Sequence, residues 1–313
     1  MLHLEPLGTY VTTSIAGPVY ATPADPGRIG DYRIVREPGD TRPLYRFRDR
    51  LGAQAEPGRF HLYAGWFCPW AQRSTLVVAL AGLQDAVSVS YVDGARDARG
   101  WAFRETSGPD PVNGFVLLRD AYEATEPGFD GHVSVPTLWD RRTRRVVSND
   151  YGLLDADLAT AFLHLSTTGL ELYPAALRDR VDELDRWLGP AVNAGVTAAQ
   201  GDGEQALSAR ARLNEAFEAL DARLAGSRFL LGDRLTLADV RLWVTLVRYD
   251  VQANATGALG GPLADHPQLW DYARDLYQRQ AFRSTTDLST FTAPGALVPD
   301  WERPTRRSAG VAP

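Results

Sequence analysis

The sequence contains one cysteine, Cys68, and no lysine, so all 33 of its Lys and Arg residues are arginine. A lone cysteine excludes an internal disulfide and a cysteine-rich zinc site. The five histidines are scattered and form no pair at the spacing of metal ligands on a helix, so we expect no metal. No apolar run approaches the roughly 20 residues that a membrane helix needs. The first residues lack the basic and apolar regions of a secretory signal, so the expected location is the cytoplasm.

The rest of the composition is that of an ordinary globular protein. Hydrophobic residues make up 44% and charged residues 23% of the 313 positions, which is enough apolar material for sizeable cores. Length predicts about two domains. The net charge of −6 argues against a nucleic-acid partner, and the absence of apolar runs argues against a membrane partner. Arginine in place of lysine, with abundant Ala, Gly and Asp, indicates a GC-rich genome.

The first half of the chain reads as a small α/β domain behind an irregular segment. Residues 1–58 are rich in Pro, Gly, Thr and Arg, and we expect them to lie extended over a domain. Alternating apolar residues predict four strands, a helix follows the first strand, and a long loop with one short helix precedes the third. This order combines a crossover with a final hairpin. The predicted strands are 59–66, 86–93, 132–140 and 146–150, the helix runs to about residue 83, and the loop is 94–131.

The second half is helical throughout. From Tyr151 onward apolar residues recur with the 3.6-residue period of amphipathic helices. Thr236, followed three residues later by Asp239, has the signature of a capping box at a helix start, and Gly226 is typical of a helix end. We expect helices over residues 177–192, 204–226, 235–253 and 266–282. The predicted domains are therefore 59–150 and 151–290, with 291–313 as a tail.

Cys68 stands immediately before Pro69, which is the pattern of a helix start. Proline at the first helical position loses nothing, because its missing N–H would be unpaired there. Cys68 would then cap the helix and face its free N–H groups and positive dipole end. This position predicts a thiol pKa lowered from about 8.5 toward about 6, and thus a nucleophilic thiolate. The alternative is an inert buried cysteine that happens to precede proline.

Ala71 occupies the position where many redox proteins carry a second cysteine. The chain cannot resolve a disulfide at Cys68 by itself, so an external thiol must release any sulfur bonded there. A second feature is Pro136 in a predicted strand, where it costs a ladder hydrogen bond. A cis Val135–Pro136 bond would turn the Val135 backbone outward to pair with a peptide-like ligand. The alternative is an ordinary trans proline at a sheet edge.

Four stretches together resemble the glutathionyl-hydroquinone reductases, the omega-like Xi class of glutathione transferases. They are residues 58–93, 133–150, 235–250 and 269–278, and the resemblance extends in order over 58–285. It implies a thioredoxin-like domain followed by a helical glutathione-transferase domain, and a homodimer. It also implies that a cysteine attacks the thioether sulfur of a glutathionyl-hydroquinone and releases the hydroquinone. A second glutathione then opens the enzyme–glutathione disulfide.

By position, the resemblance makes Cys68 the nucleophile and implies a set of thiol-binding residues. Trp70 would pack against the thiol with Arg73 nearby, and Asp150 would bind its amino group. Val135 would offer its backbone beside Pro136.

This chain departs from the family at several of these positions. Gln72 replaces a histidine, and Asp150-Tyr151 replaces a Glu-Ser pair that holds the γ-glutamyl group. Family tyrosines that hydrogen-bond the quinol correspond to Thr197 and Ala253. A tyrosine ring can stack on a sugar, and mycothiol, the thiol of GC-rich actinobacteria, carries a sugar in place of γ-glutamate. We therefore hypothesise a divergent actinobacterial member that uses mycothiol instead of glutathione.

The predicted electrophile pocket is more apolar than in the family. Trp187, Trp243 and Tyr249 lie on helices expected to face Cys68 and are candidate pocket residues; alternatively they are core aromatics. Three functions remain open at this point. The first is a reductase of S-conjugated quinols, thioethers or mixed disulfides. The second is a transferase that conjugates a thiol to electrophiles, which a Ser or Tyr would serve better than Cys68. The third is a non-catalytic carrier of apolar ligands.

Overall fold

The computed structural model describes residues 17–53 and 55–305. Its α/β part is built on four strands in the order β2-β1-β3-β4. Strand β1 pairs parallel with β2 and antiparallel with β3, which pairs antiparallel with β4. The predicted crossover and final hairpin are thus confirmed. The strand bounds are β1 (Phe60–Ala64), β2 (Val87–Tyr91), β3 (Thr137–Asp140) and β4 (Arg145–Ser148).

The strand β3 is shorter than the sequence predicts. Regular pairing begins at Thr137 and leaves residues 132–136 as a loop. Pro136 accounts for this start, because a proline has no N–H with which to join a sheet ladder. The loop, rather than the strand, therefore carries Val135 past the beginning of the first long helix.

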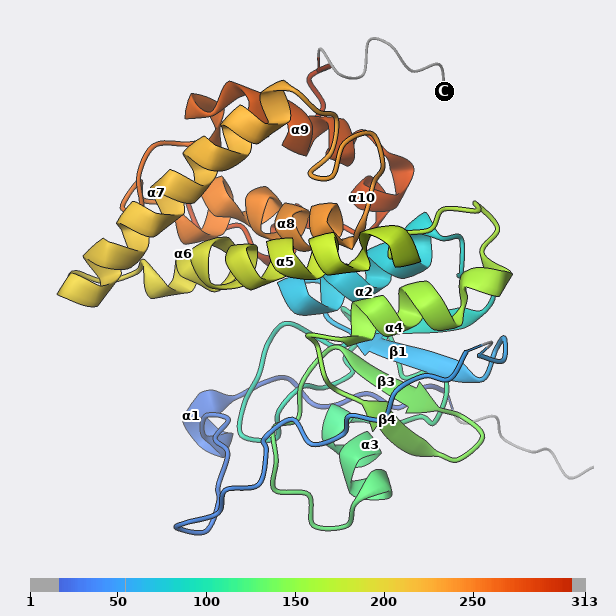
Figure 1. Ribbon diagram of the computed structural model, residues 1–313. Coiled ribbons are helices and arrows are strands. Elements are labelled where there is room, and N and C mark those ends of the chain that lie inside the picture. The colour runs from blue at the N-terminus through green and yellow to red at the C-terminus, as the bar shows by residue number, and fades with distance from the viewer. Residues whose placement is uncertain (1–16, 54, 306–313) are drawn as a thin grey trace, which may run out of the picture.

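Helix α2 (Pro69–Leu80) connects the two parallel strands, as a crossover between parallel strands requires. It contacts β1 on one side and α4 (Leu154–Ala161), α8 (Leu237–Arg248) and α10 (Gln280–Ser284) on the other. Figure 1 shows it at the junction between the sheet and the helical part. All residues from 71 to 78 are buried, since the helix has protein on almost every side. The long segment 94–131 contains the one short helix expected, α3 (Leu118–Thr125).

The helical part matches the periodicity of the sequence. A capping box starts α8, with the Thr236 N–H donating to the Asp239 carboxylate at 2.8 Å, and Gly226 caps the end of α7. A π-turn extends both α5, at 189–193, and α8, at 249–253. The remaining helices are α1 (Pro26–Ile29), α5 (Arg178–Leu188), α6 (Gly195–Ala198), α7 (Glu204–Ala225) and α9 (Pro267–Tyr277). Single 3-10 turns lie at 163–165, 175–177, 263–265 and 288–290.

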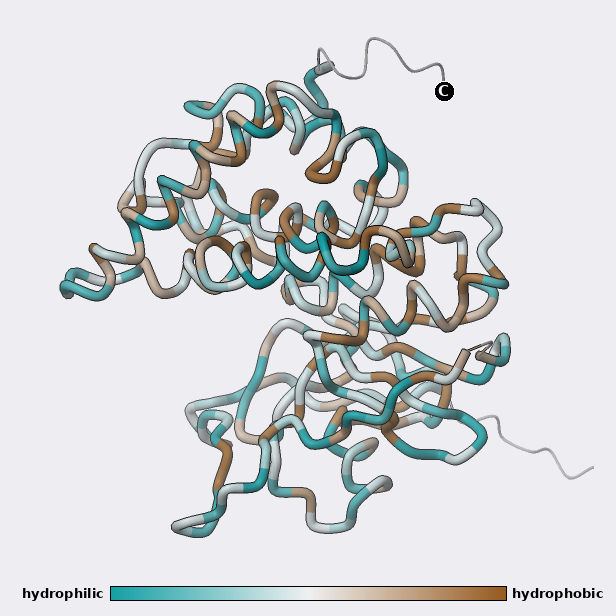
Figure 2. Tube along the Cα trace, viewed as in Figure 1, coloured by the Kyte–Doolittle hydropathy of each residue, from teal (hydrophilic) through white to brown (hydrophobic). Residues whose placement is uncertain are grey.

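One hydrophobic core runs through both parts of the molecule. It extends from Leu62 and Leu138 of the sheet through α2 into the helices α4 to α9. A second cluster, which includes Tyr63, Tyr122 and Trp139, covers the other face of the sheet under α3. Figure 2 shows the hydrophobic residues gathered on the sides of helices and strands that face one another. Because the core is continuous, the start of α2 is fixed relative to both parts.

The N-terminal segment follows the edge of the sheet beside β4. The N–H of Asn149 donates to the Phe47 carbonyl at 3.0 Å, and the Asp49 N–H donates to the Val147 carbonyl at 3.2 Å. At the other end of the chain, the ring of Trp301 is buried 4.8 Å from that of Trp270. Residues 1–16 of the predicted extended segment and 306–313 of the predicted tail lie outside the described residues.

Candidate active site around Cys68

Cys68 occupies the N-cap of α2, as its position before Pro69 predicts. Its sulfur accepts a hydrogen bond from the Ala71 N–H at 3.5 Å. The thiol in turn donates to the carbonyl oxygen of Val135 at 3.5 Å. The residue is only 8% exposed, because the loop before β3 and the helical part close around it. The thiol is thus fixed by a helix terminus and by the loop that carries Pro136.

The expected lowering of the Cys68 pKa is not what the structure gives. Burial raises the pKa of the thiol, because a thiolate loses its hydration there. The N–H groups of Ala71 and Trp70 and the guanidinium groups of Arg248 and Arg73 act in the opposite direction, without overcoming burial. The helix terminus therefore favours the thiolate as predicted, but it does not decide the protonation state. In the folded protein the thiol is neutral at pH 7.

The Val135–Pro136 bond is cis, which confirms the first of the two interpretations of that proline. Ser134, the residue before Val135, is held by the buried Tyr122, whose hydroxyl accepts a hydrogen bond from the Ser134 N–H at 3.2 Å. Within the part of the chain that the structure describes, no group accepts a hydrogen bond from the Val135 N–H. This N–H follows Ser134, which anchors the loop, and belongs to the residue whose carbonyl accepts from Cys68.

Aromatic rings border the thiol on its outer side. The Trp70 ring lies 5.1 Å from that of Tyr151, which lies 5.2 Å from that of Tyr45. We call Trp70, Tyr151 and Tyr45 the aromatic corner. The Arg73 guanidinium also stacks on the Trp70 ring at 4.5 Å. The sequence-predicted residues Trp70, Arg73 and Tyr151 are thus brought together. The three rings of the aromatic corner remain partly exposed.

Tyr45 was missed by the sequence analysis. It belongs to the irregular N-terminal segment, and only the pairing of that segment with β4 brings it to Tyr151. The one local signal is a pair of aromatic residues, Tyr45 and Phe47, in a stretch otherwise rich in Pro and Arg. Burial raises the pKa of Tyr45 to about 12, with Tyr151 and Cys68 adding to the shift.

Asp150 lies at the end of β4, next to the aromatic corner, but its carboxylate already has partners. One oxygen accepts a hydrogen bond from the Gly152 N–H at 3.2 Å. The other lies 3.7 Å from Nε of Arg48. A ligand amino group would therefore have to share or displace the Arg48 cation, which is a weaker arrangement than a carboxylate with no cation beside it.

A buried ion pair between Asp155 and Arg241 lies beside Arg73. The Asp155 carboxylate accepts hydrogen bonds from Nε and Nη2 of Arg241 at 2.8 and 2.9 Å. Burial acts to raise the pKa of Asp155, but Arg241 and Arg73 outweigh it and hold that pKa below its ordinary value. Burial lowers the pKa of Arg73 to about 10, so its guanidinium is still charged at pH 7.

A cavity of about 300 Å³ opens beside Trp70 between α2 and the helical part. It contains both positions at which the family's quinol-binding tyrosines are replaced, Thr197 and Ala253. The expected apolar character holds only in part, since several amide, hydroxyl and guanidinium groups reach the wall. The polar lining residues are Asn193, Thr197, Gln200, Thr245, Arg248 and Gln252; the others are Pro69, Trp70, Val196, Val244 and Ala253.

Arg248 and Gln72 connect this cavity to the C-terminal segment, and neither was singled out as a site residue. Arg248 donates to the Gln72 side-chain oxygen, to the Val244 carbonyl at 2.9 Å and to the Trp66 carbonyl at 3.2 Å. The Gln72 amide nitrogen donates to the Thr285 carbonyl at 3.0 Å. A charged residue at the end of the apolar run that forms α8 was the available signal for Arg248.

The three aromatic residues expected to line the substrate pocket do not lie in this cavity. Trp243 is fully buried and donates from its indole nitrogen to the Ala273 carbonyl at 3.2 Å. Tyr249 is also fully buried, with its hydroxyl 3.4 Å from the Gly261 carbonyl. Both are core residues, as the alternative interpretation had it. Trp187 is 36% exposed and lies on the outer face of α5 beside Pro190.

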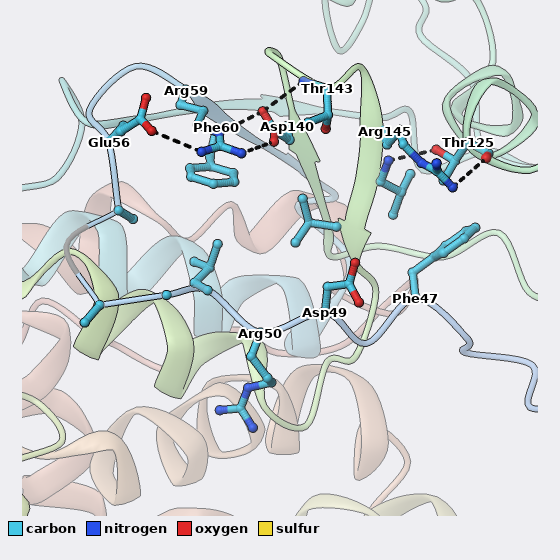
Figure 3. Close-up of a pocket in the computed structure, with 16 residues that line it drawn as sticks. Phe47, Asp49, Arg50, Glu56, Arg59, Phe60, Thr125, Asp140, Thr143 and Arg145 are labelled. Atoms are coloured by element: carbon cyan, nitrogen blue, oxygen red, sulfur yellow. Dashed lines mark hydrogen bonds and ion pairs between the residues drawn. The ribbon is translucent and has the colours of Figure 1, made fainter.

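A larger cavity of about 700 Å³ lies elsewhere, between the N-terminal segment and the sheet. Figure 3 shows partners for two of its cations, Arg59 and Arg145, and the third, Arg50, pairs with Asp157 outside that view. Arg59 pairs with Glu56 at 3.2 Å and with Asp140 through a bidentate contact, and Arg145 donates to the Thr125 carbonyl at 3.2 Å. None of the sequence-predicted site residues lines it. It is therefore not part of the site around Cys68.

Two further findings concern only the described residues. Over 17–53 and 55–305, no three His, Cys, Asp or Glu side chains are grouped so that they could hold a metal ion. No helix in the same ranges has both the length and the apolar character needed to cross a bilayer.

The chain is similar to proteins of known class. Residues 192–275 match the family model described as glutathione S-transferase, C-terminal domain. The glutathionyl-hydroquinone reductase PcpF of Sphingobium chlorophenolicum is 36% identical over 66% of this chain and 67% of its own. The glutathionyl-hydroquinone reductase YqjG of Escherichia coli is 34% identical over 75% of this chain and 74% of its own.

Solved structures agree with these relatives. The Xi-class glutathione transferase of Natrialba magadii superposes with a TM-score of 0.78 at 32% identity, over 84% of this chain and 90% of that one. The fold is thus a thioredoxin-like domain followed by the helical domain of glutathione transferases, as the sequence predicts. The chain belongs to the glutathionyl-hydroquinone reductase family, the Xi class of glutathione transferases, and is an enzyme of this thiol-dependent reductase kind.

Proposed function

We propose that the protein is a monothiol reductase in which Cys68 removes a low-molecular-weight thiol from S-conjugated hydroquinones or related thioethers and mixed disulfides. One observation carries the proposal. The only thiol of the chain caps α2 at 3.5 Å from the Val135 carbonyl, and the neighbouring Trp70 lines a cavity of about 300 Å³. The Val135 N–H and carbonyl suit the peptide-like part of a thiol ligand, and the cavity suits the group conjugated to its sulfur.

The reaction has two balanced steps. Ionised Cys68 attacks the thioether sulfur, so that a disulfide forms to the small thiol while the carbon–sulfur bond breaks. The electron pair of that bond goes to the ring, which gains a proton and leaves as the hydroquinone. A second molecule of the thiol, as thiolate, attacks the disulfide and regenerates Cys68. The net result is reduction of the conjugate and oxidation of two thiol molecules to their disulfide. Because burial raises the Cys68 pKa, Cys68 must ionise before it attacks, and we expect the rate of attack to rise with pH.

The finer proposal is that the small thiol is mycothiol. Two features support it over glutathione. The ring of Tyr151 stands where the family has a small hydroxyl, and it forms the aromatic corner with Trp70 and Tyr45, a surface on which a sugar can stack. The carboxylate of Asp150 is already beside the Arg48 cation, which leaves it poorly placed for the free amino group of a γ-glutamyl arm.

The experiment compares the two thiols on the same sulfur. Reduced protein is mixed with glutathione disulfide or with mycothiol disulfide, and the Cys68 adduct is followed by intact mass. We expect the mycothiol adduct to form at least tenfold faster, and Tyr151→Ser to narrow that ratio by weakening sugar stacking. Tyr151→Phe is the matched control, since it removes only the hydroxyl and keeps the ring that forms the aromatic corner, so the ratio should persist. Equal rates for both disulfides in the unaltered protein would refute the choice of mycothiol.

Turnover tests the reductase itself. A hydroquinone thioether of each thiol is supplied with excess free thiol, and release of the hydroquinone is followed by chromatography. We expect Cys68→Ser to abolish release, because serine forms no disulfide with the thiol. If the variant instead kept the full rate, or if the unaltered protein bound the conjugate without releasing hydroquinone, the carrier function would replace the reductase.

A further inference from the structure

Arg248 is a buried cation without a counter-charge. It ends α8 with 4% of its surface exposed. Its hydrogen-bond acceptors are the neutral oxygens of Gln72, Val244 and Trp66, and its Nε has no partner. Among the described residues, no carboxylate lies within ion-pair distance of it. A buried charge normally has an opposite charge beside it, because lost hydration must be replaced.

Other buried arginines of the same region show the usual arrangement. Arg241, two turns earlier on α8, has the Asp155 carboxylate at 2.8 Å and that of Asp185 at 3.4 Å. Arg274 of α9 pairs with Asp271. These two arginines have acids as partners, whereas Arg248, like the buried Arg73 of α2, has no carboxylate within ion-pair distance among the described residues. Burial lowers the pKa of Arg248 to about 10, which leaves the guanidinium charged at pH 7.

Arg248 also borders the cavity beside Trp70, together with Val244 from the preceding turn of α8. The guanidinium is held in place from behind, since Phe291 covers its flat face at 4.1 Å and Gln72 accepts from its Nη1. The volume of about 300 Å³ is at the lower end for small-molecule pockets and suits a single substituted ring.

We propose that Arg248 binds an ionised oxygen carried by the aromatic group of the substrate, so that the enzyme selects conjugates whose ring bears a carboxylate or an acidic phenol. The inference rests on the proposed function, because it places the ring of the conjugate in this cavity. While Cys68 is protonated, the anion would supply the negative charge that no carboxylate of the described chain supplies to Arg248. The same guanidinium would stabilise negative charge that develops on the ring as the carbon–sulfur bond breaks.

Binding of the ring alone tests the inference without any chemistry. Free 2,5-dihydroxybenzoate and its carboxamide, which has the same shape without the charge, are titrated into the unaltered protein by calorimetry. We expect the carboxylate to bind at least tenfold more tightly, and Arg248→Gln to remove that difference. Arg248→Lys should keep most of it, because the charge remains. Equal affinities in the unaltered protein, or a preference that survives in Arg248→Gln, would overturn the inference.

A second variant covers the case in which Arg248→Gln does not fold. Gln252 lines the same cavity, and Gln252→Glu places a carboxylate there that competes with the anion. We expect this variant to lose the preference for the carboxylate while it still binds the carboxamide; an unchanged preference would count against an anion site. Release of hydroquinone from the matching thioethers is measured separately. If no hydroquinone is released although the protein still prefers the carboxylate ligand, the reductase function is refuted. If hydroquinone is released but the carboxylate and carboxamide bind equally well, the role of Arg248 is refuted.

Discussion

The sulfur of Cys68 and the carbonyl oxygen of Val135 lie 3.5 Å apart although 67 residues separate them in the chain. The contact joins the start of α2 to the loop that leads into β3. It places a nucleophile beside the backbone groups that a peptide-like thiol would pair with. It also closes the thiol off from water, so the geometry that suits ligand binding is the geometry that keeps Cys68 protonated.

Alkylation of the single thiol should therefore be slow at neutral pH and rise as pH increases. The thiolate is the reactive form, and burial raises the pKa of Cys68, so the thiolate forms only at higher pH. We expect the rate of reaction with iodoacetamide to climb about tenfold per pH unit through pH 7 and 8 and to level off only above the pKa of an ordinary cysteine. The same measurement in urea provides the unburied reference for Cys68.

Substitutions of Arg248 provide a matched test of this prediction. Because the guanidinium acts to lower the Cys68 pKa, Arg248→Gln should move the inflection to still higher pH, whereas Arg248→Lys should leave it close to that of the unaltered protein. A plateau reached already at pH 7 would show that the helix terminus outweighs burial after all.

His61 should make the protein sensitive to mild acid. Its ring nitrogens lie 2.7 and 2.8 Å from the hydroxyls of Ser88 and Ser90, and burial, assisted by Arg141, lowers its pKa from 6.5 to about 3. The unfolded chain thus binds a proton below pH 6.5 that the folded protein excludes. Stability is lost as pH falls through this window, by at most about 1.4 kcal/mol per unit for one such group.

The check is urea unfolding at pH 7.0, 6.25 and 5.5, where ordinary carboxylates, with pKa values near about 4, remain mostly ionised. His61→Gln keeps a hydrogen-bonding side chain between the serines but does not titrate. We expect its free energy of unfolding to vary less with pH than that of the unaltered protein. His132, whose pKa burial also lowers, accounts for any slope that remains. Identical slopes for the two proteins would rule out His61 as the acid-sensitive group.

Local signals in the sequence were sufficient for the framework of the site. Proline after Cys68 indicated the N-cap, Pro136 in a predicted strand raised the possibility of a cis bond to Val135, and Thr236 with Asp239 marked the start of α8. Each of these depends on residues a few positions apart. The order of strands and helices along the chain followed from the same kind of local pattern, so the fold class was predictable.

What the sequence did not reveal depends on contacts between distant segments. The burial of Cys68 comes from the whole helical part closing over α2, and Tyr45 reaches Tyr151 only because the N-terminal segment pairs beside β4. Trp243 and Tyr249 have the same helical spacing whether they face a pocket or the core. Periodicity identifies a buried face but not which neighbour buries it.

The buried pair beside Arg73 should be worth far more than a neighbouring pair whose arginine is exposed. Asp155→Asn removes the carboxylate that is hydrogen-bonded to Arg241 and leaves that buried guanidinium, which lies beside Arg73, with only the half-exposed Asp185 at 3.4 Å. We expect the free energy of unfolding to fall by about 3–5 kcal/mol. Asp157→Asn, in the same turn of α4, is the control, because its partner Arg50 is 55% exposed and the loss should be about 1 kcal/mol or less. Equal losses in urea titrations would show that the buried pair is not special.

Gln72 should determine how firmly the C-terminal segment is held against the active-site helix. Its amide nitrogen donates to the Thr285 carbonyl and to the Thr286 hydroxyl, both at 3.0 Å, while its oxygen accepts from Arg248. Gln72→Leu has a similar volume and makes none of these bonds, and it leaves a buried cation short of one more acceptor. We expect a loss of about 2–3 kcal/mol in the free energy of unfolding.

The local effect of Gln72→Leu distinguishes this role from simple core packing. Hydrogen exchange should speed up in residues 285–292, which include the turn at 288–290, while β1 and α7 keep their protection relative to the global stability. Thr286→Val is the control, because it removes one of the three bonds and should cost about 1 kcal/mol. If exchange in this segment is the same in Gln72→Leu as in the unaltered protein, the segment is held by its other contacts, such as that of Phe291 with Arg248.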